Sequence, residues 1–109
     1  MGGGIDLFVM KGGDPMFYAG DVTGYLWINS VLVYSSLPLY GSAGIYSYDP
    51  ITELRSTVVD GKENDYFELK SYSLDTTKLS YFYSDDIKHM DVAQLKASNE
   101  AVREVLIKH

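Results

Sequence analysis

Hydrophobic and polar positions alternate with a period of two along most of the chain, and each alternating segment ends at a cluster of Gly, Pro, Asn, Asp or Ser residues. Val, Ile, Tyr and Phe are concentrated inside these segments. This pattern is typical of antiparallel strands joined by short turns. We expect strands over residues 5–10, 16–19, 25–36, 45–48, 54–59, 66–73 and 78–84.

The segment 25–36 differs from the others because both of its alternating faces carry apolar side chains. A strand of this kind needs cover on both sides.

The first two segments, 5–10 and 16–19, flank Lys11-Gly12-Gly13-Asp14-Pro15, where the glycines permit positive φ and the proline favours a turn. We therefore expect a hairpin at the start of the chain.

After Asp91 the period changes from two to three or four. The apolar residues that carry this spacing are Val92, Leu95, Val102, Val105 and Leu106. Asp91 is placed to cap the first turn, and Gln94 completes a capping-box pattern. The spacing predicts one C-terminal α-helix over 92–108, which we expect to pack on an open face of the sheet.

With 109 residues, the chain is shorter than a typical pair of domains, so we expect one domain over 1–109, divided into a β-rich region (5–91) and the helix (92–108). The predicted fold class is mainly β, an antiparallel meander resembling propeller blades.

The formal charge is −6. We expect no nucleic-acid partner, because nucleic-acid affinity depends on clustered cations. The chain has no cysteine, which excludes disulfides and thiolate catalysis.

Short similar segments recur at a spacing near 40 residues. Three of them start at Ile5, Ile45 and Ile87, so the steps are 45 − 5 = 40 and 87 − 45 = 42 residues. The strand 31–36 is also similar to the strand 78–84. Repeats of this length with four short strands are typical of propeller blades.

The run Ser73-Leu74-Asp75-Thr76-Thr77-Lys78-Leu79-Ser80-Tyr81, followed by Ile87 and Asp91, resembles the repeats of TolB-like and prolyl-oligopeptidase-type β-propellers. Those blades often read Ser-Pro-Asp-Gly before a strand that ends in Tyr and Ser. The present chain departs from that pattern with Leu74 in place of Pro and Thr76 in place of Gly. The resemblance covers residues 5–91 and implies about two blades, which are too few to close a propeller. Three arrangements remain open: a fragment of a larger propeller, a self-associating subunit, or a sheet covered by the C-terminal helix, and we favour the last two.

Groups that could carry catalysis are few. The chain has two histidines, His89 and His109, and no Gly-x-Ser-x-Gly segment that would present a serine nucleophile. The densest polar cluster offers metal ligands at Asp85, Asp86 and His89, but Lys88 adds a positive charge to it and no calcium-loop order is present. We therefore expect neither a metal nor a cofactor, and a noncatalytic role is favoured over an enzymatic one.

The ten tyrosines are more than so small a core would be expected to hide. Tyr46 and Tyr48 share one face of a strand, as do Tyr81 and Tyr83. Together with Trp27 they are the candidate binding residues, because aromatic side chains contribute strongly to contacts. Cross-strand packing within the sheet is the alternative role for them.

These observations favour a noncatalytic interaction or assembly module whose partner is either another protein or a second copy of the chain in a homodimer. The alternative is an accessory propeller segment of a serine peptidase or other hydrolase.

No signal peptide is recognisable, which indicates a cytoplasmic protein if the chain is complete. No segment approaches the 18 consecutive apolar residues of a membrane span.

Overall fold

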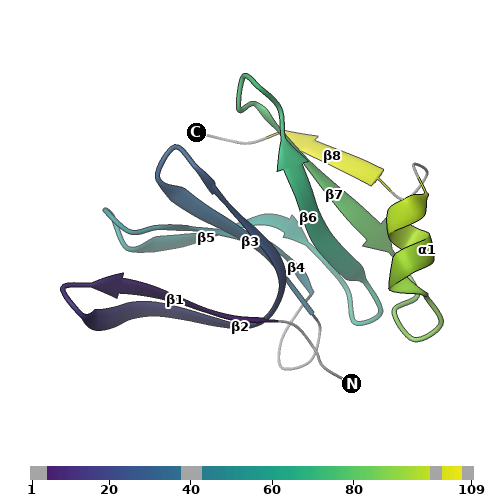
Figure 1. The fold of residues 1–109 in the computed structure, drawn as a ribbon, viewed down its shortest axis with the longest axis horizontal. Coiled ribbons are helices and arrows are strands. Elements are labelled where there is room, and N and C mark those ends of the chain that lie inside the picture. The colour runs from purple at the N-terminus through teal and green to yellow at the C-terminus, as the bar shows by residue number, and fades with distance from the viewer. Residues whose placement is uncertain (1–4, 38–42, 99–101, 107–109) are drawn as a thin grey trace.

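The computed structural model describes residues 5–37, 43–98 and 102–106, and these residues form two antiparallel sheets and one short helix (Figure 1). The first sheet is a meander of β1 (Ile5–Lys11), β2 (Asp14–Ile28), β3 (Val31–Ser36), β4 (Gly44–Asp49) and β5 (Leu54–Asp60). The second sheet has the order β6 (Tyr66–Tyr72), β7 (Lys78–Ser84) and β8 (Val102–Leu106), with the helix α1 (Val92–Ala97) between β7 and β8 in the chain. The predicted fold class, mainly antiparallel β with one C-terminal helix, is confirmed.

The prediction of a single strand over 25–36 was wrong, because a two-residue turn at Asn29 and Ser30 divides it into the end of β2 and the whole of β3. Both turn residues have positive φ, 50° and 67°. Asparagine tolerates this conformation, and a turn with two positive φ values matches the twist of a hairpin.

The predicted hairpin between β1 and β2 is present, and it turns at Gly12 and Gly13 with φ values of 61° and 89°.

The prediction of a helix over 92–108 was also wrong in its extent. Asp91 caps α1 as predicted, because its Oδ1 accepts hydrogen bonds from the backbone N–H groups of Ala93 and Gln94. The helix ends at Ala97, however, and residues 102–106 form β8, which pairs with β7. The spacing of Val102, Val105 and Leu106 fits a helix as well as a strand, and pairing with β7 selects the strand.

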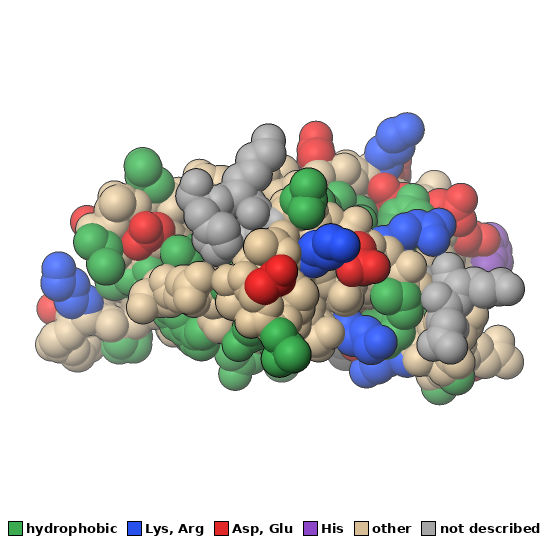
Figure 2. Space-filling model, turned by 90° about the horizontal axis from the view of Figure 1, so that it is seen from above, with side chains coloured by type: hydrophobic (Ala, Val, Ile, Leu, Met, Phe, Trp, Pro, Cys, Tyr) green, Lys and Arg blue, Asp and Glu red, His purple; other side chains and the backbone are tan. Residues whose placement is uncertain are grey.

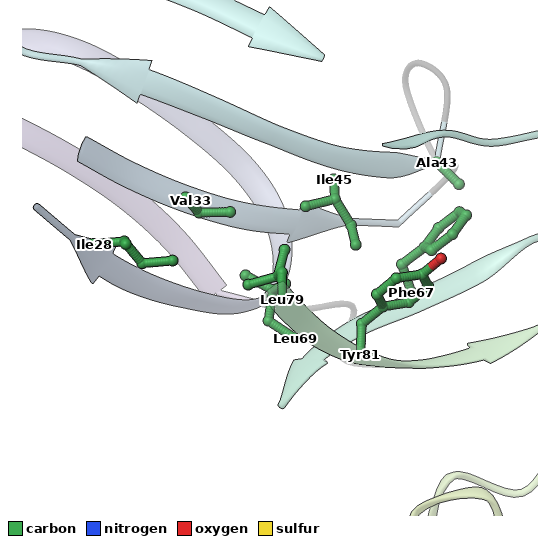
Figure 3. Close-up of a cluster of buried hydrophobic side chains, with 8 residues drawn as sticks. All are labelled: Ile28, Val33, Ala43, Ile45, Phe67, Leu69, Leu79 and Tyr81. Atoms are coloured by element: carbon green, nitrogen blue, oxygen red, sulfur yellow. The ribbon is translucent and has the colours of Figure 1, made fainter. Parts of the chain in front are cut away.

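The helix does not supply the predicted cover for an open sheet face, since none of its residues is buried. The second sheet covers the first instead. Eight side chains from both sheets and the loop before β4 form the core between them (Figure 3): Ile28, Val33, Ala43, Ile45, Phe67, Leu69, Leu79 and Tyr81. Burial of these apolar side chains is the main favourable term that holds the sheets together.

The opposite face of the first sheet has its own core, built around Tyr34 and Tyr48. β2 is 15 residues long and pairs with β1 through its first half and with β3 through its second half. An irregularity in its pairing between Val22 and Gly24 separates the two halves. Phe17 from the first half stacks on Tyr48 of β4, with ring centroids 4.1 Å apart, so the middle strands are covered on both faces.

The proposed repeat is not uniform in the structure. Segments starting at Ile5 and Ile45 are strands, whereas the segment 87–91 is a turn that leads into α1. The described residues form sheets of five and three strands and no closed propeller.

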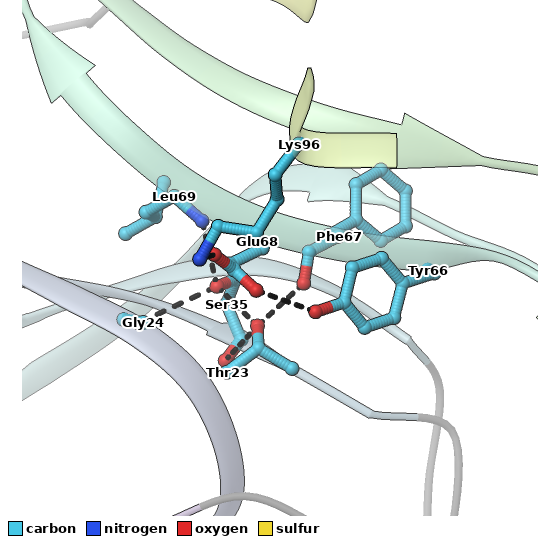
Figure 4. A network of polar contacts seen from close by, with 8 residues as sticks. All are labelled: Thr23, Gly24, Ser35, Tyr66, Phe67, Glu68, Leu69 and Lys96. Carbon is cyan, nitrogen blue, oxygen red and sulfur yellow. Dashed lines mark hydrogen bonds and ion pairs between the residues drawn. The ribbon is translucent and has the colours of Figure 1, made fainter. Parts of the chain in front are cut away.

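A chain of hydrogen-bonded hydroxyl groups joins β6 to the first sheet (Figure 4). The backbone N–H of Leu69 donates to Ser35 Oγ at 3.1 Å, Ser35 Oγ lies 2.6 Å from Thr23 Oγ1, and the Thr23 hydroxyl donates to the backbone carbonyl of Phe67. Gly24 lies at the same contact, where a Cβ atom would come within 3.3 Å of the Leu69 carbonyl oxygen. Small side chains therefore allow β6 to approach the first sheet closely.

Replacing Ser35 with alanine is expected to lower the free energy of unfolding by about 1 to 3 kcal/mol, because the N–H of Leu69 would stay buried without its partner. Urea unfolding measures this loss. The control is Ser71→Ala, which removes an exposed hydroxyl from β6 and should change stability by less than about 0.5 kcal/mol. Equal stability of the two variants would contradict the role assigned to Ser35.

The turn between β6 and β7 is ordered by Asp75, whose Oδ1 accepts hydrogen bonds from the Ser73 hydroxyl and from both the backbone N–H and the hydroxyl of Thr77. These hydrogen bonds lower the pKa of Asp75 from its ordinary value of 3.8 to about 2, and the bond from Ser73 has the largest effect. The next residue, Thr76, has a φ of 56°, a conformation that a β-branched residue rarely adopts.

Thr76→Gly is expected to raise the free energy of unfolding by about 0.5 to 1 kcal/mol, since relief of a left-handed conformation exceeds the added flexibility of glycine. Chemical denaturation compares it with Thr57→Gly, a control in the middle of β5. That control should lower stability because glycine weakens a strand interior. A loss of stability in both variants would show that the turn does not strain Thr76.

Candidate functional site

A cleft of about 1070 Å³ lies between the two sheets, on the side away from the hydroxyl chain. Its floor includes the core side chains Ile28, Val33 and Leu79. Leu54 and Val58 of β5 line it, as do Val105 and Leu106 of β8. We call this feature the inter-sheet cleft.

The cleft exists because the sheets are close at β6 and separate toward β5 and β8. Among the described strands of the second sheet, β6 makes the closest backbone approach to β2, β3 and β4, while β8 lies two strands further out. The core side chains fill the narrow part of this wedge. At the wide part, Leu54 and Leu106 keep about two thirds of their surface exposed.

The polar residues of the cleft carry hydroxyl and carboxylate groups: Ser47, Asp49, Thr52, Ser56, Thr57 and Glu104, together with Asn29 of the β2–β3 turn. Asn29 also donates to Thr76 Oγ1 at 3.4 Å, so that turn contacts the β6–β7 turn. Of the described residues that line the cleft, none is Lys, Arg, His or Tyr. The lining is thus an apolar floor with a polar border. Asp49 places its carboxylate there, whereas the side chain of Glu104, opposite Ser80, points to the other face of β8.

Two strand edges border the cleft. β5 is the last strand of the first sheet and β8 is the last strand of the second, and within the described residues neither has a strand on its outer side. The backbone groups along such an edge need hydrogen-bond partners, and they are a template for an added strand.

Tyr46 and Tyr48 lie together on β4, as the alternation predicted, but they face the aromatic core rather than the cleft. Tyr48 is 3% exposed and stacks on Phe17. Tyr46 packs against Tyr34, and the guanidinium of Arg55 lies 5.0 Å from the centre of the Tyr46 ring. Burial raises the pKa of both predicted tyrosines, and the Arg55 charge opposes this rise at Tyr46.

Tyr81 and Tyr83 also share a face of their strand, and both rings contact Phe67 in the core between the sheets. Burial raises the pKa of both hydroxyls, and for Tyr83 a hydrogen bond to Asp65 adds to the rise. This bond joins the Tyr83 hydroxyl to Asp65 Oδ1 over 2.9 Å. The structure thus places both tyrosine pairs against other aromatic rings.

Trp27 is the most exposed of the five predicted binding residues, with 48% of its surface accessible. It lines a smaller hollow of about 580 Å³, together with Met10, Met16 and Ile51. On the neighbouring β1–β2 hairpin, the rings of Phe8 and Tyr18 pack against each other, yet both remain more than half exposed. Of the five predicted binding residues, only Trp27 therefore presents a largely exposed aromatic surface.

Asp86 and His89 form an exposed pair, with His89 Nδ1 2.9 Å from Asp86 Oδ1. Asp85 is exposed in the same loop. In the part of the chain that the structure describes, no three His, Cys, Asp or Glu residues come together as a metal site. Charged side chains of both signs are interspersed on the face seen in Figure 2.

The cleft is the feature that the sequence did not reveal. It is built from residues of β2, β3, β4, β5, β7 and β8, and Leu54 of β5 is 106 − 54 = 52 residues from Leu106 of β8. The one signal available was the β-branched content of Val102 and Val105, which suits a strand edge, but their spacing also suited a helix.

Tyr48→Phe should leave the free energy of unfolding unchanged or raise it by up to about 1 kcal/mol, because no described group hydrogen-bonds to the buried Tyr48 hydroxyl. Tyr83→Phe is the matched variant and should lower stability by about 1 to 2 kcal/mol, since it removes the bond to Asp65. Thermal and urea unfolding measure both. A large loss in Tyr48→Phe would indicate a polar role for Tyr48 that packing does not explain.

Comparison of the chain with protein-family models, with curated proteins and with solved structures gives no match. No helix in the described ranges has the length and apolar character needed to cross a membrane. The geometry of the inter-sheet cleft is therefore the main basis for a functional assignment.

Proposed function

We propose that the chain is a noncatalytic protein-interaction module and that the inter-sheet cleft receives a segment of a partner protein. The observation that carries this proposal is the wedge between the sheets. It leaves apolar side chains of β5 and β8 accessible beside two strand edges that have no strand partner among the described residues. Apolar surface flanked by polar residues is the usual composition of a protein-binding groove.

The chemistry of the lining supports binding rather than catalysis. The Asp49 carboxylate, the Asn29 amide and several hydroxyls are the polar side-chain groups that the described lining offers to the cleft. Asp49 Oδ1 already accepts a hydrogen bond from the backbone N–H of Ile51 at 2.9 Å. A hydroxyl nucleophile needs an adjacent base that is itself oriented, and the lining residues supply no histidine or lysine for that task.

Binding can be tested by selecting peptides from a random phage-displayed library against the wild-type chain and retesting them on two variants. Leu54→Lys places a charge at an exposed position in the cleft, whereas Leu74→Lys, the control, changes a fully exposed residue of the β6–β7 turn. We expect selected peptides to lose at least tenfold in affinity for Leu54→Lys and to bind Leu74→Lys as they bind wild type.

Thermal unfolding verifies that both variants fold as the wild type does. The proposed function is wrong if folded Leu54→Lys binds all selected peptides with unchanged affinity. It is also wrong if no peptide is selected and Leu54→Lys changes no association measured by sedimentation.

A second candidate function is that of an accessory propeller segment in a larger hydrolase, as the resemblance implies. Two observations favour it. First, the β layers pack face to face in succession: the first half of β2 packs on the middle strands, and these pack on the second sheet. Second, Thr76 has positive φ at the position where the resembling repeats carry Gly. A coding sequence that continues into a Gly-x-Ser-x-Gly segment would favour this function over the first.

A further inference from the structure

We infer that a second copy of the chain docks at β1, where the two β1 strands pair antiparallel about Phe8. This surface is separate from the inter-sheet cleft, so the inference does not depend on the proposed function. It rests on three features of the β1–β2 hairpin: a regular strand at a sheet edge, backbone groups that point outward, and a self-complementary order of side chains.

Within the described residues, β1, β5 and β8 lie at sheet edges that have no further strand, and these three edges differ. β5 carries a bulge at Val58, which has no partner in the pairing with β4, and bulges hinder the addition of another strand. β8 has Glu104 at its centre, so symmetric pairing of two β8 strands would place like charges opposite each other. Both irregularities of the β1–β2 pairing add a residue to β2, and β1 itself runs regularly from Ile5 to Lys11. β1 is therefore the edge that best accepts an added copy of itself.

The backbone N–H and C=O groups of Asp6, Phe8 and Met10 point away from β2. Met10 is opposite Pro15, which has no N–H to donate, so this pair is of the non-hydrogen-bonded type. The direction of the backbone groups alternates along a regular strand, so those of Phe8 and Asp6 point the same way as those of Met10. Antiparallel pairing with a second β1 would give each of these groups a hydrogen-bond partner.

The order of side chains in β1 is self-complementary. Pairing about Phe8 sets Phe8 opposite Phe8, Asp6 opposite Met10, and Ile5 opposite Lys11 of the second copy. No charged residue is then opposite a like charge, and the acidic end of each β1 lies beside the basic end of the other. Moving the two-fold axis by one residue in either direction leaves residues at one end of β1 without a partner in the other β1.

The face of β1 that carries Phe8 is apolar and accessible. Phe8, Met10 and Tyr18 are each more than half exposed, and the ring centroids of Phe8 and Tyr18 are 4.9 Å apart. Setting Phe8 opposite Phe8 would extend this pair into a continuous row of aromatic rings across the two copies. Removal of these rings from water favours the dimer.

The contact is isologous, since the same strand is used by both copies. One strand from each copy forms a small interface, and small interfaces are typical of weak association. Both copies also carry a formal charge of −6, and the resulting repulsion is screened by salt. We therefore expect a dimer that forms at high protein concentration in about 0.3 M salt.

Sedimentation velocity between about 10 μM and about 1 mM compares the wild-type chain with Phe8→Lys and Met10→Lys. Both variants add one positive charge to the same face of β1. Phe8→Lys sets two lysines opposite each other, so its dissociation constant should rise at least about tenfold. Met10→Lys sets each new lysine opposite Asp6 of the other copy, so its dissociation constant should stay within about threefold of that of the wild type.

Thermal unfolding verifies that both variants are folded. A wild-type chain that stays monomeric at about 1 mM, or equal weakening in the two variants, would overturn the inference. Leu54→Lys, the cleft variant, should dimerise as the wild type does. Loss of the dimer in Leu54→Lys but not in Phe8→Lys would place the contact at the inter-sheet cleft, and this result would overturn the inference without contradicting the proposed function.

The register is tested with single cysteines, because the wild-type chain has none. In the paired strands the Cα atoms of the two Phe8 residues would be about 5.5 Å apart, which suits a disulfide. Those of the two Met10 residues would be displaced by about four residues, or roughly 14 Å, which is too far. In air, Phe8→Cys should therefore form a disulfide-linked dimer at least about ten times faster than Met10→Cys. Equal rates, or a faster reaction of Met10→Cys, would exclude pairing about Phe8.

Discussion

The hydrogen bonds that run from Leu69 through Ser35 and Thr23 to Phe67 are the constraint on which the arrangement of the two sheets depends. Backbone groups of β6 that point away from β7 are buried against the first sheet, and they would destabilise the fold without partners. Two small hydroxyl side chains supply those partners, and Gly24 lets the strands approach. The contact also covers the edge of β6, which would otherwise remain open.

This close contact at one side of the second sheet is linked to the cleft at the other side. Small residues hold β6 against the first sheet, whereas the larger side chains Ile28, Val33 and Leu79 lie between the sheets at the floor of the cleft. The sheets diverge toward β5 and β8, and in the part of the chain that the structure describes the apolar side chains at the wide end have no facing strand. The candidate binding site is thus a consequence of how the core is built rather than an addition to it.

Most local elements could be predicted from the sequence. Alternation and turn residues located nearly all strands, and the apolar character of both faces of 25–36 indicated that this region needs cover on two sides. The structure confirms that need, since Leu32 and Tyr34 face one core while Val33 faces the other. The prediction failed at Asn29-Ser30, where a turn interrupts the pattern without a glycine or proline. It also failed at 102–106, where the apolar spacing of a short segment fits a helix and a strand equally well.

The sequence by itself determined the fold class, because alternation of side chains and the placement of turn residues are local properties of the chain. Only the tertiary structure decided which apolar faces meet, that the aromatic residues Tyr48 and Tyr81 are core residues, and that residues 102–106 become a strand. These outcomes depend on contacts between residues far apart in the chain, such as Ser35 with Leu69 and Leu79 with Val105. The cleft belongs to the same class, since its walls come from strands whose distance and angle no local pattern specifies.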